Sequence, residues 1–402
     1  MQNYYENSLQ HLQDELKRID LLIYRQIQRL RDERHNNTTK EYRGLFISEE
    51  EIDGILKKNL NYDKPNNPSS SRRAEIKEFN NYLQELHTRI SQRKAASLER
   101  CIYLSLSHLS YIFQLTSFEI DCLLICLAPE MDLGYERLYA YLQNDVTKKR
   151  PTVNLILKLL CHSLEERTFA RPFFSAHAAL FRYHLLRFSG EPQDSLSPLL
   201  SRSLKLDDRI VDFLLGFQET DARIRPFVRR IEPQTRLKDT IIPEELKERL
   251  GNLSLKLKEG KEHNKGFSPL TRSIFYLKGP SINGQQQTAE AICHDLGLPL
   301  LVVDVDSMLG GGVPWDIGFN LVFREALLQA SAVYFKGFER LLEEGEKNAI
   351  RKGPFLDALE EFTGPIFLEG ERTWEPKFRY QSSHFFKLEF PIPSYPLRRR
   401  LW

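Results

Sequence analysis

Two stretches near the start of the chain carry apolar residues in alternating steps of four and three. The first stretch runs through Tyr5, Leu9, Leu12, Leu16, Ile19, Ile23 and Leu30, with polar Gln26 as a break. The second follows the polar segment 65–71 and runs through Ile76, Phe79, Leu83, Leu86 and Ile90. This spacing predicts two helices that bury one face against each other or against the next domain. An oligomerising coiled coil is less favoured, because about three heptads are marginal for one.

Helix signals also dominate residues 98–217. A helix is predicted with Thr116 or Ser117 as its N-terminal cap and Glu119 in its first turn, and Pro129 is predicted to end it. Two further helices are predicted over residues 133–142 and 151–160, the last with Pro151 at its first position. Three short helices in succession are typical of a helix-turn-helix or winged-helix arrangement.

A basic triplet, Lys148, Lys149 and Arg150, directly precedes the third of these helices, where a recognition helix would meet phosphates. Nearby acids dilute its charge: Asp121, Glu130, Asp132, Glu136 and Asp145. Because a DNA reader is usually basic over its whole binding face, a protein-contacting winged helix is favoured over a DNA reader.

Strand and helix patterns alternate in the last third of the chain. The expected strands are 273–278, 300–304, 332–335, 365–368 and 385–390, and the expected helices are 288–296, 317–330 and 355–362. This alternation predicts a parallel α/β sheet covered on both faces. Before it, the basic and proline-containing stretch 223–238 is predicted to be an extended connector, and residues 256–265 a surface loop.

A degenerate phosphate-binding loop follows the first of these strands. Its two glycines have the spacing of G-x-x-x-x-G-K-[ST], between a strand and a helix, as that motif requires. The loop residues are Gly279, Pro280, Ser281, Ile282, Asn283, Gly284, Gln285 and Gln286. Gln285 stands where the motif has its lysine, and Gln286 where it has the hydroxyl residue that holds Mg²⁺.

The chemistry of a working phosphate loop is missing from these positions. A lysine normally neutralises the β- and γ-phosphates, and a Ser/Thr with an acidic residue positions Mg²⁺. Gln285 is neutral, and the strand that should end in acidic residues ends in Lys336-Gly337, which would repel a metal ion. Ile282 adds a β-branched residue where a loop of this kind can need a positive φ. We therefore expect no hydrolysis from this module and no bound metal.

These residues resemble the nucleotide-binding domain of AAA+ ATPases. Residues 279–286 match Walker A in spacing, Lys336-Gly337 match Walker B in position, and Glu371 stands at the sensor-1 position without its expected asparagine. Segments 115–119, 127–130, 135–142 and 150–153, with the N-terminal helix and residues 42–51, resemble the winged-helix region of one AAA+ subfamily. That subfamily includes bacterial ATPases associated with contractile injection systems.

The resemblance implies a degenerate first AAA+ module that is followed, in the family, by a competent second one. The fold class expected is multidomain: a mainly α N-terminal half with a winged-helix-like domain, then an α/β P-loop domain without its helical lid. The expected domains are 1–95, N-terminal helices; 96–220, winged-helix-like; 221–270, connector; and 271–402, degenerate AAA+ module. The chain stops at Trp402, where the lid would begin, so we expect the front half of an ATPase that is itself inactive.

Three functional hypotheses follow from the resemblance. In the first, the chain is a regulatory and assembly segment that recruits protein partners through its winged helix and N-terminal helices and seats a second AAA+ module or other subunits in an oligomer. In the second, it binds ATP as a sensor without hydrolysing it; no other cofactor is required. In the third, it is a DNA-binding adaptor, so nucleic acid is the less favoured partner.

Composition narrows the setting of the protein. The 402 residues are 41% hydrophobic and 28% charged, which is typical of a globular protein of two or three domains. The net charge of +2 indicates no bulk attraction to polyanions. We expect no membrane span and no secretory signal, and hence a cytoplasmic protein. Cys122 and Cys126, one turn apart in an apolar run, are expected to be reduced core thiols.

Three weaker candidates are given no catalytic role. Cys161-His162 resembles a nucleophile pair, but adjacent residues on a helix point in different directions, so core packing is favoured. Asp304 and Asp306 share a face of a strand end and suggest an acid/base pair or a metal site. The triplet 310–312 suggests a phosphate loop, but it lacks a following G-K-[ST] and is more simply a flexible loop.

Overall fold

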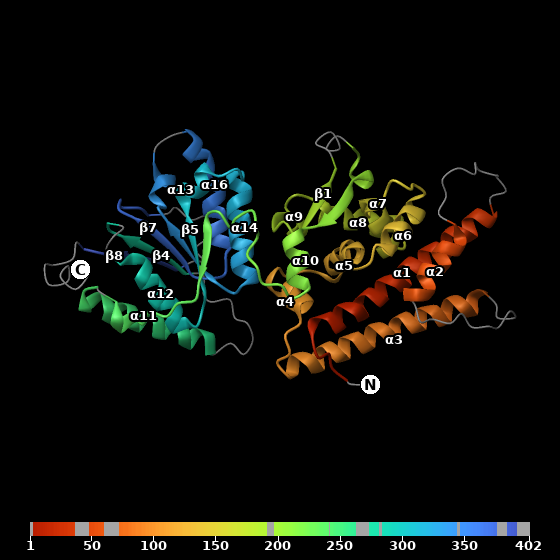
Figure 1. Cartoon of the computed structure of the whole chain (residues 1–402), viewed down its shortest axis with the longest axis horizontal. Coiled ribbons are helices and arrows are strands. Elements are labelled where there is room, and N and C mark those ends of the chain that lie inside the picture. The colour runs from red at the N-terminus through yellow and green to blue at the C-terminus, as the bar shows by residue number, and fades with distance from the viewer. Residues whose placement is uncertain are drawn as a thin grey trace. The chain divides into compact units, whose positions relative to one another are not determined.

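The computed structural model describes residues 3–36, 48–59, 72–190, 197–240, 242–262, 273–280, 284–343, 346–375 and 384–391. The chain divides into two compact units, Met1–Gln218 and Glu219–Trp402. The first unit is mainly helical and the second is an α/β unit (Figure 1). None of the helices in these ranges is long and apolar enough to cross a membrane.

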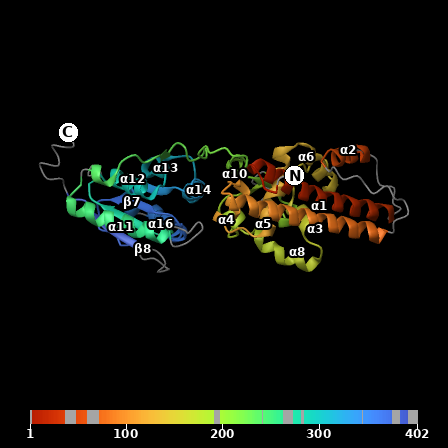
Figure 2. The same ribbon diagram turned by 90° about the horizontal axis from the view of Figure 1, so that it is seen from below.

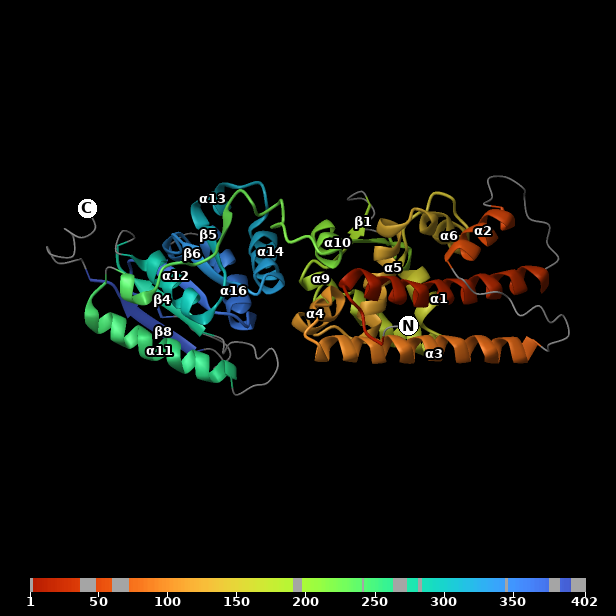
Figure 3. The ribbon, with the colours of Figure 1, turned by 60° about the horizontal axis from the view of Figure 1, so that its bottom comes forward.

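The first unit is built on two long helices, α1 (Ser8–Asn36) and α3 (Arg72–Glu99), which lie side by side (Figures 2 and 3). α1 also packs against α5 and α7, so the predicted apolar faces are buried both against each other and against the neighbouring helices. Leu9 departs from this prediction, because its side chain is 46% exposed. The other elements are α2 (Glu49–Asn59), α4 (Ser105–Ile112), α5 (Ser117–Met131), α6 (Gly134–Gln143), α7 (Val153–Leu160), α8 (Leu164–Ala170), η1 (Arg171–Phe174), α9 (Ala179–Arg182), β1 (Leu186–Ser189), η3 (Leu199–Ser201), β2 (Ser203–Leu206) and α10 (Asp208–Leu214).

The predicted cap of α5 is confirmed and its predicted end is wrong. The Thr116 hydroxyl accepts a hydrogen bond from the Glu119 amide at 3.3 Å, and the Glu119 carboxylate accepts one from the Thr116 amide at 2.9 Å. Pro129, however, lies inside the helix, which runs on to Met131. Proline has no N–H for the Ile125 carbonyl four residues back, and the Tyr139 hydroxyl donates to that carbonyl instead, at 2.7 Å.

The helix α7 begins two residues later than predicted, because Pro151 and Thr152 are extended. The Leu204 amide of β2 donates to the Pro151 carbonyl at 2.8 Å, and Thr152 forms a bridge to the same strand. Thr152 then caps the helix by accepting a hydrogen bond from the Leu155 amide at 3.3 Å. β1 and β2 pair antiparallel. Along the chain, this strand pair comes after α5, α6, the short extended segment and α7.

The second unit contains a six-stranded sheet in the order β3-β5-β6-β7-β4-β8. Its five C-terminal strands are parallel, and β3 pairs antiparallel with β5 at one edge. The strands are β3 (Val228–Ile231), β4 (Ser273–Lys278), β5 (Leu300–Asp304), β6 (Ala332–Lys336), β7 (Ile366–Gly370) and β8 (His384–Glu389). The predicted parallel α/β sheet is thus confirmed, with an antiparallel strand added.

Helices cover both faces of this sheet, as predicted (Figure 1). Ile274 and Tyr276 of β4 belong to the core beneath α13, α14 and α16, whereas Phe275 and Leu277 belong to the core beneath α11 and α12. This alternation follows from the two-residue period of a strand. The remaining elements are η4 (Leu237–Asp239), α11 (Glu244–Glu262), α12 (Gln285–Leu296), α13 (Val305–Gly310), α14 (Trp315–Leu328), α15 (Glu339–Leu342) and α16 (Glu346–Glu361).

The segment predicted to be an extended connector joins the second unit instead. β3 lies within it, and the fully buried Arg324 of α14 pairs with the buried carboxylate of Asp221. Arg223 holds the same carboxylate through its Nη2 at 2.6 Å. Burial alone would raise the pKa of Asp221, but the hydrogen bonds from Arg223 and the charge of Arg324 lower it. The chain is therefore fastened to α14 by a buried carboxylate between two guanidinium groups.

The cysteines of the described ranges are free, as predicted. Cys122 and Cys126 are buried, and burial raises the pKa of both thiols well above the ordinary value. Cys161 is also buried while its neighbour His162 is exposed, so the two side chains lie in different surroundings and core packing accounts for the cysteine.

Candidate functional site

The candidate site lies where β4, β6 and β7 end, at the carboxyl edge of the sheet. Ligands bind at this edge in open parallel α/β sheets, near the point where the strand order reverses. That point is at β4, since the next strand along the chain, β5, lies beyond β7 and β6, whereas β8 lies on the other side. The predicted phosphate loop therefore leaves the sheet at the expected place.

The start of the loop is held tightly between neighbouring strands. The Gly279 amide donates to the Gly370 carbonyl of β7 at 2.9 Å, and the Phe390 amide donates to the Lys278 carbonyl at 2.7 Å. Gly279 has φ of +154°, and a Cβ there would stand 2.4 Å from the Phe390 carbonyl oxygen. A glycine is required here by the close approach of the chain after β8.

Of the predicted loop residues, Ser281, Ile282 and Asn283 lie outside the described residues. Gly284 is described and has φ of +82° at the start of α12. The predicted helix after the loop is confirmed and begins earlier, at Gln285, directly after this second glycine.

Gln285, at the predicted Walker A lysine position, is fully buried, and its side chain turns back on its own loop. Its Nε2 donates to the Leu277 carbonyl at 3.2 Å and to the Gly279 carbonyl at 2.7 Å. Its Oε1 has no hydrogen-bond partner among the described residues. Gln286 points along the helix, where its Nε2 donates to Glu290 at 2.8 Å. Neither amide places a positive charge at this edge.

Lys336, at the predicted Walker B position, ends β6, and Gly337 follows it, so no acidic pair stands there. The Lys336 side chain is exposed, and Gly337 turns the chain with φ of +70°. The nearest acid along the chain, Glu339, is committed elsewhere: its carboxylate accepts hydrogen bonds from the amides of Glu371 and Arg372, at 2.9 and 3.2 Å. The Glu339 carboxylate thus links the segment after β6 to the turn after β7, and these hydrogen bonds compete with any metal ion for its oxygens.

The turn after β7, which contains the predicted sensor-1 position, is held mainly through its backbone. Arg372 Nε lies 3.1 Å from Glu339 Oε1, and the Tyr276 hydroxyl donates to the Arg372 carbonyl at 2.6 Å. Burial, followed by the nearby Glu339 charge, raises the pKa of Tyr276 to about 12. Glu371, at the predicted sensor-1 position, has an exposed side chain and contributes its amide.

A buried pair that sequence reasoning missed lies one layer below this edge. The Tyr334 hydroxyl of β6 donates to the Glu369 carboxylate of β7 at 2.8 Å, and both side chains are buried. Burial, and then the charge of Glu369, raises the pKa of Tyr334 well above its ordinary range. The sequence signal that could have revealed this pair is Glu369, the single charged residue within the otherwise apolar run 366–370. The pair ties two adjacent strands together and leaves the phenol neutral.

The two aspartates proposed as a metal or acid/base pair have separate partners. Asp304 caps α13 by accepting a hydrogen bond from the Ser307 amide at 2.8 Å. Asp306 accepts one from Arg340 Nε at 2.9 Å. In the described part of the chain, no group of three or more His, Cys, Asp or Glu side chains is placed to hold a metal ion.

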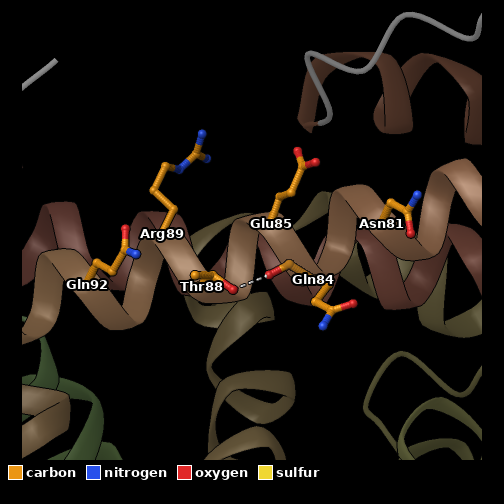
Figure 4. A pocket seen from close by; sticks show the side chains of 6 residues that line it. All are labelled: Asn81, Gln84, Glu85, Thr88, Arg89 and Gln92. Atoms are coloured by element: carbon orange, nitrogen blue, oxygen red, sulfur yellow. Dashed lines mark hydrogen bonds between the residues drawn. The ribbon is translucent and has the colours of Figure 1, made fainter.

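One further hollow, of about 390 Å³, lies along α3 (Figure 4). It is lined by Asn81, Gln84, Glu85, Thr88, Arg89 and Gln92, which follow one another along a single helix face. The hydrogen bond drawn there runs from the Thr88 hydroxyl to the Gln84 carbonyl within the same helix, at 2.9 Å. Because these side chains do not converge on a common point, they form a solvated polar face.

The comparison with protein families identifies the first unit. The family model described as "Winged helix domain, variant" matches residues 1–228. The chain belongs to this family. The comparison with curated proteins gave no match. Among solved structures, the chain is similar to the "FIGL-1 AAA domain", with 14% identity, a TM-score of 0.34, and coverage of 53% of this chain and 67% of that one. It is also similar to PCH-2 of C. elegans, with 12% identity, a TM-score of 0.32, and coverage of 43% and 51%.

The winged helix domain offers little to a nucleic acid at its third helix. Five of the eight residues of α7 are buried, namely Val153, Leu155, Ile156, Leu157 and Leu159. A recognition helix needs an exposed face for base edges. In the preceding turn, Lys149 Nζ lies 3.6 Å from Glu136 and Lys148 Nζ lies 3.9 Å from Asp145. Burial of the helix and pairing of two basic residues do not favour the DNA-reading hypothesis.

Proposed function

We propose that this chain is a regulatory and assembly segment of an AAA+-type ATPase, in which the second unit keeps a nucleotide-binding fold for its shape and does not hydrolyse ATP. The winged helix domain and the N-terminal helices then recruit a protein partner, and the second unit seats a catalytic module or other subunits in an oligomer. The observation that carries the proposal is the inward-turned, uncharged Gln285.

The loss of affinity expected at this position can be estimated. A hydrogen bond to a charged donor contributes about 1.5–3 kcal/mol, against about 1 kcal/mol for a neutral one. Gln285 has in addition committed its Nε2 to the carbonyls of Leu277 and Gly279, so a phosphate would have to displace those contacts. Glutamine in place of the motif's lysine thus removes both the positive charge and the hydrogen-bond donor that a phosphate would need.

The metal-binding half of the chemistry is also missing. Lys336 would repel Mg²⁺, and Glu339 already accepts two backbone hydrogen bonds and an ion pair. Hydrolysis needs a metal bridging the phosphates and a group that orients the attacking water. Three other acids near this edge, Glu369, Asp304 and Asp306, each have a partner within the protein.

Restoring the two Walker residues is the test of this assignment. We expect a Gln285→Lys, Lys336→Asp variant to bind Mg-ATP about 10- to 150-fold more tightly than the unmodified chain, because a charge-assisted contact of about 1.5–3 kcal/mol is regained. Isothermal titration calorimetry should therefore show saturable binding by the variant at nucleotide concentrations that give no saturable heat with the unmodified chain. The new lysine can donate to the two carbonyls that Gln285 now contacts, so the fold should tolerate it.

The matched control is Gln287→Lys with Lys336→Asp. Gln287 is exposed on α12, so its replacement adds the same charge two residues after Gln285 and outside the loop. Equal affinities for the control and the restored variant, or no binding by a restored variant with an unchanged melting curve, would count against an AAA+-type site.

A further inference from the structure

The short helix α2 is seated on a surface formed by α1 and α6. Ile52 and Leu56, four residues apart and therefore on one face of the helix, are its buried side chains, at 0% and 4% exposure. Ile55 lies beside them, and its Cγ2 would be 3.4 Å from a Cβ placed on Gly134. The apolar contact of α2 is thus narrow.

Ion pairs and a hydrogen bond hold the N-terminal half of α2. Arg31 of α1 lies 2.5 Å from Glu49 and 3.0 Å from Asp53. The Tyr141 hydroxyl of α6 donates to the other oxygen of Glu49 at 2.6 Å. Two elements that are far apart in sequence therefore converge on one carboxylate.

Two further ion pairs hold the same helix. Arg137 of α6 pairs with Glu51. Near the end of α2 the charges are reversed, and Lys58 lies 2.7 Å from Asp132, the residue that follows α5. The receiving surface, which we call the α1/α6 surface and define by Arg31, Arg137 and Tyr141, is basic where α2 is acidic. Exposed pairs of this kind are weak and are screened by salt.

The helix has little stability of its own. It has 11 residues and contains Gly54, and isolated helices shorter than about 12–15 residues are marginal in water. Its helical state therefore depends on docking. Elements with few buried apolar contacts and many exposed polar ones open locally at the lowest free energies in a protein.

We propose that α2 is a displaceable occupant of the α1/α6 surface, and that this surface binds an acidic amphipathic helix of a partner protein when α2 is released. The partner helix carries two apolar residues four positions apart, with carboxylates before and between them, as α2 does. The inference deepens the assembly role proposed above by naming the kind of partner. Its test does not involve the nucleotide-binding fold, so ATP binding by the chain would overturn the proposed function and leave this inference standing.

Hydrogen exchange of the full chain tests whether α2 opens separately. We expect the amides of α2 to exchange at least about tenfold faster than those of α5, and at least about threefold faster again when NaCl is raised from about 50 to 500 mM. Exchange of α2 and α5 at the same rate in both salts would overturn the proposal, because α2 would then be part of the cooperative core.

A peptide with the sequence of residues 48–59 tests the surface itself. In a full-length Ile52→Asp, Leu56→Asp variant the surface is vacated, and fluorescence anisotropy should show at least about tenfold tighter peptide binding than with the unmodified chain. Adding Arg137→Glu should reduce that gain by up to about fivefold, because an exposed pair contributes about 0–1 kcal/mol. Lys57→Glu, at an exposed position of α2, should not raise peptide binding. Absence of peptide binding to a vacated variant that keeps the melting curve of the unmodified chain would overturn the proposal.

Discussion

An Asp221→Asn variant is expected to lose about 3–5 kcal/mol of unfolding free energy in the second unit. The substitution leaves the fully buried guanidinium of Arg324 without its charged partner, and breaking a buried pair on one side costs about this much. The melting temperature should fall by about 6–20 °C for a unit of this size. Trp315, Trp374 and Trp402 all belong to this unit, so intrinsic tryptophan fluorescence follows its unfolding selectively.

Two comparisons isolate the cause of this loss. Glu219→Gln removes an exposed acid two residues earlier, whose pair with Arg225 should contribute about 0–1 kcal/mol. Adding Arg324→Met to Asp221→Asn should recover at least about 1 kcal/mol, because the stranded charge is gone. A loss no larger than that of Glu219→Gln would contradict the anchoring role given to this pair.

The effect should also depend on pH in a defined direction. Although burial alone would raise it, the pKa of Asp221 is lowered by its hydrogen bonds to Arg223 and by the charge of Arg324. A lowered folded-state pKa contributes stability that is present above the unfolded value of about 3.9 and is lost as the pH falls through the folded value. The difference between the native chain and Asp221→Asn should therefore shrink below about pH 4.

The second large effect is expected from Gly279→Ala at the start of the phosphate loop. A methyl group there meets the Phe390 carbonyl oxygen at 2.4 Å, so β8 or the loop must move, at a typical cost of about 1–3 kcal/mol for overpacking. The positive φ adds about 1 kcal/mol. Chemical denaturation followed by tryptophan fluorescence measures the sum.

Gly297→Ala is the control for the backbone part of that cost. Gly297 has φ of +65° at the end of α12, and a Cβ there meets nothing within 4 Å. It should therefore lose only the conformational part, about 1 kcal/mol. If the two variants were equally stable, the close approach of the chain after β8 to the loop would not be a constraint on this position.

Local signals explain what could be predicted from the sequence. The apolar run 273–278 and the two glycines after it place the strand and the loop, because strand propensity and turn geometry depend on neighbouring residues. The Thr116 capping box was predictable for the same reason. The end of that helix was not, because Tyr139, which replaces the hydrogen bond that Pro129 cannot make, arrives from a different helix.

Contacts between distant segments explain what was missed. β3 has the pattern Val228-Arg229-Arg230-Ile231, which does not alternate, and it is a strand because β5 pairs with it. Glu339 joins two strand ends that are brought together only by the sheet order. In the same way, the absence of a lysine at position 285 could be read from the sequence, whereas the inward turn of Gln285 depends on the positions of the Leu277 and Gly279 carbonyls.

We propose that the second unit keeps a nucleotide-binding fold but does not bind ATP. Calorimetric titration of the unmodified chain with Mg-ATP tests it most directly, with tryptophan fluorescence as a second readout. We predict no saturable heat up to about 1 mM nucleotide, which corresponds to binding weaker than about −4 kcal/mol. A saturable, one-to-one heat at micromolar nucleotide, lost in the presence of EDTA, would contradict the account.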